Sequence, residues 1–584
     1  MDVPTPAISG PSPAANAPAP SWLPGWALWL AERPLAFYPL LAVLAVFLYW
    51  PGQMDVPPLD RDEPRFAQAA KQMVESGNFV EIAFQDEPRL KKPIGIYWLQ
   101  GASVSLLASD DPTALWAYRL PSLIGMALSV LLVAGIGRVL FKGPVGAIGA
   151  GLFAIAIMPT VEAHMAKTDA VLLACILAAQ WALAKAWMAE HPATARGPVG
   201  TGPWAAAAFW LALGAGVLVK GPVIVMIVGL TALALALWHR RFGWLMALRP
   251  LWGLPLALAV ILPWFVAIHF ATDGAFWQEA VGRDLLAKLG SGQENHGGPP
   301  GLYLALVWVT FWPAAALLGF AALGAWRGRM APAVRFCLAW IIPNWLVFEV
   351  VATKLPHYVL PVYPALALLA AYMLVRAGQR PRKRWVAEAV RAPVWLAMVV
   401  AGGLALGMFA GPPFIGGDFD VWSVAAALAF GALAYVLYRF GRGAFEAPFP
   451  LGLVVLLAGV GYGVSYSQIL PTFSTLWVSP RLAEAVADHT PRECDGPARL
   501  VSVGYSEPSL VFLAGTDTVL VRPDEAVPVL KADPTCTLAA VDARDWPAFE
   551  EALQGTPVET LTTIEGLNYS KGKQVSMRLV RVER

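Results

Sequence analysis

Charged residues gather in two short stretches that follow the first long apolar segment of the chain. The first is Leu59-Asp60-Arg61-Asp62-Glu63-Pro64-Arg65-Phe66, and the second is Arg89-Leu90-Lys91-Lys92-Pro93. Charge is costly beside a membrane, so a dense charged loop there indicates a reaction site. We expect Asp62 to be a carboxylate base or an electrostatic anchor, with Glu63 supporting it and Arg65 contacting an anion. In a purely structural interpretation, Asp60 or Asp62 caps a helix over Glu63–Glu75, and both roles are compatible.

Three lysines stand where apolar segments meet polar turns. Lys92 precedes Pro93 and a short apolar helix expected over Ile94–Leu107, so it either snorkels to lipid headgroups or binds a lipid-linked phosphate. Lys220 stands before Gly221-Pro222 between two apolar runs. Gly-Pro breaks the helix, and a turn needs no lysine, so an anion partner is the better interpretation. Lys354, followed by Pro356, repeats this arrangement.

Further candidates stand near these lysines. Asp169 begins an apolar segment, where it either caps the helix or faces the same cavity. His296 lies in a Gly/Pro-rich loop, Ala271–Pro300, that is a plausible mobile lid or acceptor contact, and Tyr358 follows Lys354. We therefore assign His296 and Tyr358 to the acceptor side. No second ligand stands at a diagnostic spacing from His296, so no metal ligand is predicted.

The composition is that of a membrane protein. Hydrophobic residues make up 57% of the 584 residues and charged residues only 14%, against about 25% charge in soluble domains. Many apolar runs approach the roughly 20 residues that span a bilayer. The net charge of +2 comes from bases scattered between apolar segments and not on one face, so it gives no support for a nucleic-acid partner, and none is expected.

Thirteen spans are expected, and their loops indicate the orientation. Pro93–Leu107 is too short to count as a span and is expected to lie in the interface. With a cytoplasmic N-terminus, inner loops and their flanks hold 17 Lys and Arg residues and the short outer loops hold five. The expected spans are Pro34–Trp50, Arg119–Leu140, Val145–Val161, Ala170–Met188, Trp204–Val219, Pro222–Trp238, Leu251–Phe270, Gly301–Gly324, Phe336–Val351, Tyr358–Val375, Val394–Phe409, Val421–Tyr438 and Leu451–Leu470.

This topology divides the chain into three parts. Residues 1–27 are expected to form a disordered cytoplasmic tail, and residues 28–470 a membrane domain whose first outer loop is 51–118. Residues 471–584 alternate β-like runs (such as Thr518–Val521) with helix-like ones (such as Trp546–Leu553), which predicts a small outer α/β domain. Its two cysteines, Cys494 and Cys536, either pair or stay free.

Lysines and carboxylates on one membrane face suit transfer from a phosphate-linked donor. Cations hold the phosphate and offset charge on the leaving group, and a carboxylate takes a proton from the acceptor. An apolar body admits a donor whose anchor is a lipid.

At these residues the chain resembles the polyprenyl-phosphate-sugar glycosyltransferases of the GT-C fold, in particular the bacterial protein mannosyltransferase and lipid A aminoarabinose transferase branch. The resemblance extends over roughly the first 370 residues. The matching series is Asp62-Glu63-x-Arg65-Phe66-Ala67, Lys92-Pro93 with Tyr97-Trp98, Arg119-Leu120-Pro121-Ser122, Thr168-Asp169-Ala170, Lys220-Gly221-Pro222, Pro263-Trp264, and Lys354 with Pro356, Tyr358, Pro361 and Pro364.

The resemblance implies an α-helical membrane body with a periplasmic active site in the bacterial inner membrane. It implies an undecaprenyl-phosphate-linked sugar donor, an envelope acceptor such as lipid A, core or another glycan, contact with membrane lipids, and inversion at the anomeric carbon. Asp62 matches the catalytic aspartate, Asp169 the second-loop acid, and Lys92 and Lys220 the phosphate contacts. Many relatives carry an acid before Lys-Pro where this chain has Lys91, so no cofactor is assigned and a divalent metal is left open.

Two other classes remain open from the residues alone. A transporter or lipid flippase typically has internal repeats and charges near mid-membrane, whereas the charges here cluster at one face. A membrane scaffold leaves the positions of Asp62 and Lys220 unexplained.

Overall fold

The computed structural model describes residues 25–59, 61–141, 143–191, 201–280, 282, 297–376, 381–443, 445 and 448–583. The expected tail over residues 1–27 therefore lies almost wholly outside the described residues. Asp60 and His296, both named as candidates, also lie outside them.

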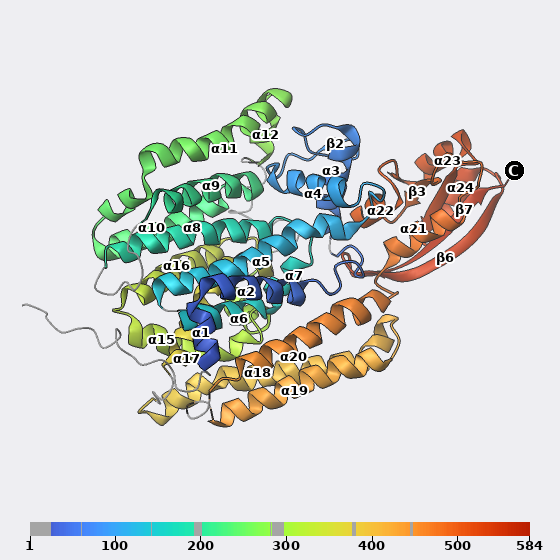
Figure 1. The fold of residues 1–584 in the computed structure, drawn as a ribbon. Coiled ribbons are helices and arrows are strands. Elements are labelled where there is room, and N and C mark those ends of the chain that lie inside the picture. Colours follow the sequence, from blue (N-terminus) through green and yellow to red (C-terminus); the bar gives the residue numbers. More distant parts are fainter. Residues whose placement is uncertain are drawn as a thin grey trace, which may run out of the picture.

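Most of the described chain is a bundle of long apolar helices (Figure 1). Within the described ranges, nine helical segments are long and apolar enough to cross a membrane. They are α5 (Leu115–Leu140), α8 (Asp169–Ala189), α9 (Pro203–Lys220), α11 (Pro250–Ala271), α16 (Pro332–Val350), η5 with α17 (Pro356–Val375), α18 (Arg384–Ala410), α19 (Val421–Gly443) and α20 with its π and 3-10 extensions (Leu451–Thr472).

Four other apolar segments depart from a straight, full-length span. Two are bent pairs: α6 (Gly143–Ala154) with α7 (Ile157–Ala163), bent by 66°, and α14 (Leu302–Thr310) with Ala314–Gly328, bent by 114°. Two are shorter helices, α2 (Pro34–Tyr49) and α10 (Val223–His239). Each expected span overlaps one of these helices or bent pairs, and the number that crosses the membrane stays a prediction.

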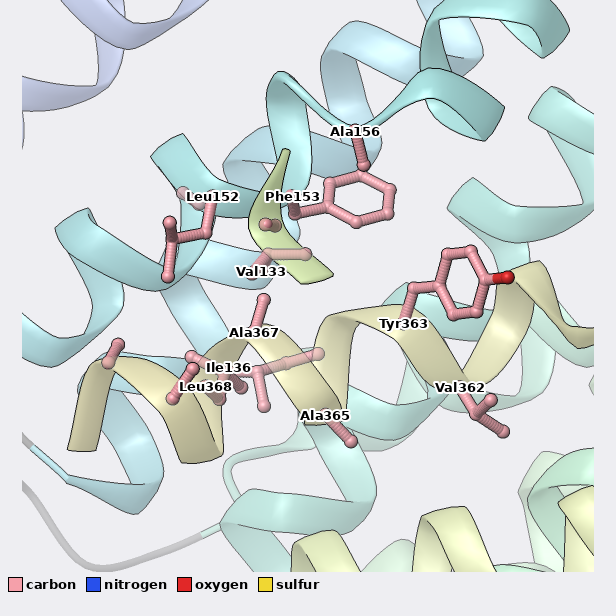
Figure 2. Close-up of a cluster of buried hydrophobic side chains, with 14 of the residues drawn as sticks. Val133, Ile136, Leu152, Phe153, Ala156, Val362, Tyr363, Ala365, Ala367 and Leu368 are labelled. Atoms are coloured by element: carbon pink, nitrogen blue, oxygen red, sulfur yellow. The ribbon is translucent and has the colours of Figure 1, made fainter. Parts of the chain in front are cut away.

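Small residues let the central helices approach closely. A Cβ on Gly137 of α5 would lie 2.4 Å from the Cα of Gly146 of α6, so this crossing requires glycine. Figure 2 shows side chains from α5, α6 and α17 packing together at this centre, among them Val133, Phe153 and Tyr363. The packing fixes α6 and therefore the connection that leads into α7 and α8.

The first outer loop is a folded unit. It contains α3 (Asp62–Ser76), a hairpin of β1 (Ala83–Phe84) with β2 (Glu87–Pro88), and α4 (Gly95–Leu107). Phe66, Ile96 and Tyr97 are buried together in its apolar core. The 13-residue α4 corresponds to the expected short helix, and it packs on α3, α5 and α9.

The C-terminal residues form the small α/β domain expected from the sequence. Its five strands are ordered β4-β3-β5-β7-β6, with β3, β4 and β5 parallel and β6 and β7 antiparallel. Cys494 and Cys536 form a disulfide, which resolves the alternative left open above. The elements are α21 (Val478–Asp488), β3 (Arg499–Val503), α22 (Pro508–Ala514), β4 (Val519–Val521), α23 (Pro523–Ala532), β5 (Thr537–Asp542), α24 (Trp546–Leu553), β6 (Val558–Asn568) and β7 (Lys573–Val582).

Candidate active site

A cavity of about 1330 Å³ opens where the membrane helices, the first outer loop and the C-terminal domain meet. Its lining comes from the start of α3, the hairpin, the α7–α8 connection, the end of α9 and the start of η5. Asp62, Lys92, Asp169, Lys220 and Tyr358 all line it, so the structure brings these five sequence candidates together. Arg65, also predicted, lines it as well.

Lys220 contacts Asp169 in the lining of the cavity. Lys220 ends α9, and Gly221, with φ of 67°, turns the chain into α10, as the Gly-Pro pair predicted. The Lys220 ammonium donates a hydrogen bond to Asp169 Oδ1 over 2.6 Å and lies 5.7 Å from the ring of Tyr358. Asp169 is the first residue of α8, where a carboxylate also interacts favourably with the helix dipole.

Three residues that the sequence did not single out extend this pair. Lys167 forms an ion pair with Glu162 over 2.9 Å. The two ring nitrogens of His357 lie 3.7 Å from Glu162 Oε1 and 3.7 Å from Asp169 Oδ1, so His357 links the two acids. Burial disfavours the ammonium of Lys167, but the adjacent Glu162 and Asp169 raise its pKa above the ordinary lysine value.

The sequence held one signal for this network. Glu162 directly follows an apolar run, and an acid at the end of such a run is costly unless it has a partner. Its partners come from separate segments, and nothing in the order of residues indicates that His357 lies beside it.

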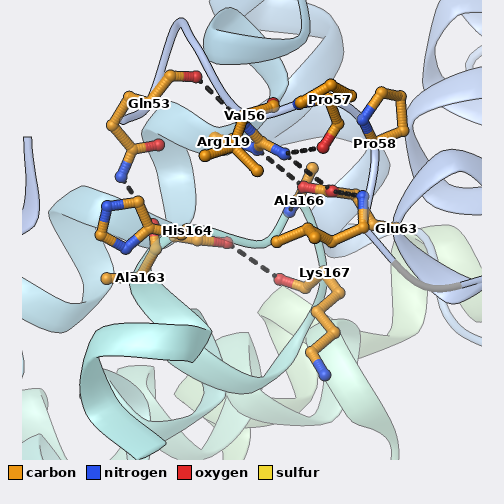
Figure 3. A network of polar contacts seen from close by, with 12 residues as sticks. Gln53, Val56, Pro57, Pro58, Glu63, Arg119, Ala163, His164, Ala166 and Lys167 are labelled. Carbon is orange, nitrogen blue, oxygen red and sulfur yellow. Dashed lines mark hydrogen bonds and ion pairs between the residues drawn. The ribbon is translucent and has the colours of Figure 1, made fainter. Parts of the chain in front are cut away.

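Glu63 is buried and points away from the cavity. Its Oε1 accepts hydrogen bonds from Arg119 Nε (2.8 Å) and from the Ala166 amide (2.8 Å), and its Oε2 accepts from Arg119 Nη2 (2.9 Å) and the Leu59 amide (2.6 Å). Figure 3 shows this cluster, in which Arg119 also donates to carbonyls of the first loop. Glu63 is absent from the cavity lining, so its place is that of a positioning residue beside Asp62.

Asp62 is accessible from the cavity. Its side chain is 44% exposed, and Arg65 Nη1 lies 3.7 Å from its Oδ1. Asp62 is the first residue of α3, while Arg61 occupies the N-cap position. The capping role considered for Asp62 is therefore wrong by one position, and its carboxylate is oriented towards the cavity.

Lys354 does not line the cavity. Its ammonium donates to the backbone carbonyls of Glu349 (2.9 Å) and Val351 (2.5 Å) at the end of α16. Its neighbours Thr353 and Leu355 do line the cavity. The geometry gives Lys354 the role of satisfying the carbonyls at a helix end, so we leave it out of the proposed phosphate site.

The lining is richer in cations than in anions. The segment that follows the hairpin contributes Arg89, Lys91 and Lys92, and Arg89 donates a hydrogen bond to the Tyr97 hydroxyl over 3.2 Å. Across the described residues, no group of three or more His, Cys, Asp or Glu side chains is arranged to hold a metal ion. The basic side chains of the lining are Arg61, Arg65, Arg89, Lys91, Lys92, Lys167 and Lys220, and the acidic ones are Asp62, Glu87, Glu162, Asp169 and Glu279.

Sequence comparisons support the resemblance stated above. Residues 91–266 match the family described as dolichyl-phosphate-mannose-protein mannosyltransferase. The undecaprenyl phosphate-alpha-4-amino-4-deoxy-L-arabinose arabinosyl transferase of Pseudomonas paraeruginosa is 28% identical over 431 residues, which cover 73% of this chain and 70% of that protein. Its namesake from Edwardsiella ictaluri is 27% identical over 445 residues, covering 73% and 76%.

Structural comparison agrees with the fold. The crystal structure of ArnT from Cupriavidus metallidurans bound to undecaprenyl phosphate superposes with a TM-score of 0.71. The match covers 94% of this chain and 98% of that one at 18% identity. The same protein in the apo state gives 0.68. The GT-C fold with a small C-terminal sheet domain is therefore confirmed.

Proposed function

We propose that this chain, a multi-pass glycosyltransferase of the GT-C fold that uses a polyprenyl-phosphate-linked sugar, glycosylates an envelope glycolipid at the periplasmic face of the bacterial inner membrane. The observation that carries the proposal is one cavity, next to the apolar helices, that combines the cations Lys92 and Lys220 with the accessible carboxylate of Asp62.

The donor phosphate is proposed to lie on the cationic side of the cavity. Lys220 and the bases of the segment after the hairpin supply positive charge where a phosphate carries negative charge before and after the sugar leaves. Asp169 holds the Lys220 ammonium by the 2.6 Å bond and therefore fixes its direction. Asp169 is thus better suited to orienting Lys220 than to accepting a proton from the acceptor.

Asp62 is proposed as the general base. In the reaction an acceptor oxygen attacks the anomeric carbon, the bond from that carbon to the phosphate oxygen breaks, and polyprenyl phosphate leaves with the bonding electrons. The acceptor proton passes to the Asp62 carboxylate, whose exposed side chain leaves room for an incoming hydroxyl. Attack opposite the phosphate inverts the anomeric carbon.

The donor lipid is proposed to be undecaprenyl phosphate, because several relatives carry that lipid in their names. An outer position for the cavity is supported by the excess of basic residues in the loops on the other side. The disulfide between Cys494 and Cys536 supports the same orientation, since disulfides persist in oxidising compartments such as the periplasm.

The experiment is mass spectrometry of lipid A, core and other envelope glycans from a deletion strain. The strain is complemented with wild type, with Asp62→Asn, or with Asp110→Asn at matched expression. Asp110 is an exposed acid in the same loop that does not line the cavity, so it is the matched control.

We expect one sugar mass to disappear on deletion and to return with wild type and with the control. The Asp62→Asn strain should lack it, because an amide cannot accept the proton. Full restoration by Asp62→Asn would disprove the base assignment. A deletion that changes no envelope glycan would contradict the proposed transfer and favour transport of a lipid instead.

A further inference from the structure

We propose that the C-terminal domain forms the acceptor-facing wall of the cavity, with Ser506 and Ser570 contacting the acceptor and Glu507 positioning Arg61 next to Asp62. This inference rests on the proposed function and adds a role for a domain whose sequence has no catalytic pattern. Its first support is direct, because Ser506, Pro508, Leu520 and Ser570 of this domain belong to the cavity lining.

Glu507 joins the domain to the residue before the proposed base. It is 4% exposed, and its Oε2 forms an ion pair with Arg61 Nε over 3.2 Å. Its Oε1 accepts a hydrogen bond from Asn568 Nδ2 over 2.8 Å and lies 3.8 Å from the ammonium of Lys571. A buried carboxylate needs such partners, so the domain fixes Arg61, and Arg61 is the N-cap of the helix that begins with Asp62.

The domain is held firmly against the first outer loop. Phe512 of α22 is buried in the apolar core of that loop and packs edge-on against Tyr118 at 5.4 Å. On the polar side of the contact, Gln85 donates to the carbonyls of Thr516 (3.1 Å) and Thr518 (2.5 Å). Gln85 belongs to the hairpin that leads into Arg89 and Lys92, so the docked domain also steadies the cationic part of the cavity.

The chemistry of this wall fits a sugar-bearing headgroup better than a lipid chain. Ser506 and Ser570 are exposed and each offers a hydroxyl that both donates and accepts hydrogen bonds. The lipid of the donor must leave the cavity towards the membrane helices, beside Lys220 at the end of α9. The C-terminal wall comes from the soluble domain, which leaves the acceptor headgroup as its ligand.

The experiment uses the purified full-length protein in detergent, with undecaprenyl-phosphate aminoarabinose as donor and lipid A as acceptor probe. Steady-state rates give kcat and the KM of each substrate, and binding of lipid A is measured separately without donor. The variants are Ser506→Ala with Ser570→Ala, and Glu507→Gln, which keeps the acceptor for Asn568 but removes the charge. Glu559→Gln is the matched control, because Glu559 pairs with Arg581 on the exposed surface of β6 and β7.

We expect the double serine variant to raise the lipid A KM and dissociation constant about fivefold to tenfold, as for loss of one or two neutral hydrogen bonds. The donor KM should stay unchanged. Glu507→Gln should lower kcat with the fold intact, as checked by its thermal midpoint, and Glu559→Gln should change neither constant.

The outcomes separate the two proposals. If wild type transfers the sugar and the serine variant has an unchanged KM for lipid A, the proposed role of the wall is wrong and the proposed function stands. Absence of transfer by wild type excludes this donor and acceptor as the substrate pair of the proposed function, and the wall is then judged by lipid A binding alone. Weaker lipid A binding by the serine variant than by wild type supports the wall. Lipid A binding that is absent from wild type, or equal in the two proteins, overturns the wall.

Discussion

Glu63 and Arg119 form a fully buried bidentate ion pair, with Arg119 Nε 2.8 Å from Oε1 and Nη2 2.9 Å from Oε2 of Glu63. The pair joins the start of α3 to α5, and the Ala166 amide ties the same carboxylate to the connection that precedes α8. Of the two acids proposed to act in the cavity, Asp62 directly precedes Glu63 and Asp169 follows Ala166 by three residues. One buried pair therefore sets the spacing between the proposed base, Asp62, and the pair of Asp169 with Lys220.

Removal of one partner of this pair should unfold the site. In Arg119→Ala the Glu63 carboxylate stays buried without its counter-charge, which costs about 3–5 kcal/mol in buried pairs. We expect a marked fall in the thermal midpoint in detergent. Arg581→Ala, which breaks the exposed pair with Glu559, should cost at most about 1 kcal/mol. Equal midpoints for the two variants would show that the buried pair does not hold the loop.

Lys220 and Lys354 should behave differently, although both stand before a proline turn. Lys220→Gln can still donate to Asp169 but loses its charge, so the affinity for undecaprenyl phosphate should fall about tenfold or more. Lys354→Gln should leave that affinity within about twofold and lower the thermal midpoint instead, because its ammonium bonds the carbonyls ending α16. Titration of detergent-purified variants with undecaprenyl phosphate measures both. An affinity loss in Lys354→Gln would return this lysine to the phosphate site.

The contrast between these two lysines shows what a sequence can predict. The apolar runs and the Gly-Pro break in the sequence predict that Lys220 lies at a helix junction. The expected topology puts its partner Asp169 at the same membrane face. Lys354 has the same pattern, but its direction depends on where α16 ends and which carbonyls remain unsatisfied there. The spacing of residues in the sequence does not predict which carbonyl groups a lysine will bond.

The buried network has the same limit for another reason. Glu162 and His357 are almost 200 residues apart in sequence and meet because α7, bent by 66° relative to α6, contacts η5. In the soluble domain, by contrast, the helix expected over Trp546–Leu553 forms over those same residues, because its pattern is local. Local periodicity is readable, whereas pairing between distant segments requires the fold.

The disulfide should stabilise the C-terminal domain. Cys494 and Cys536 are separated by 42 residues, and closing a loop of that size contributes about 2–4 kcal/mol in the chain-entropy model. Replacement of both cysteines by serine should therefore lower the unfolding midpoint of this domain. The midpoint is measured by limited proteolysis of the full chain. Cys337→Ser serves as a control for altered thiol content, since Cys337 is a free cysteine in α16. An unchanged midpoint in the paired variant would contradict a stabilising bond.

Single-cysteine labelling should reveal the orientation of the cavity. In intact spheroplasts a membrane-impermeant maleimide should label Asp110→Cys in the first outer loop and leave Arg241→Cys unlabelled until the membrane is opened. Both positions are exposed in the structure, so accessibility to water differs only by membrane side. Wild type gives the background, because Cys175 and Cys337 lie in α8 and α16 and the other two cysteines are paired. The reverse labelling pattern would put the cavity and the C-terminal domain in the cytoplasm. The basic loops would then lie on the periplasmic side, against the positive-inside rule.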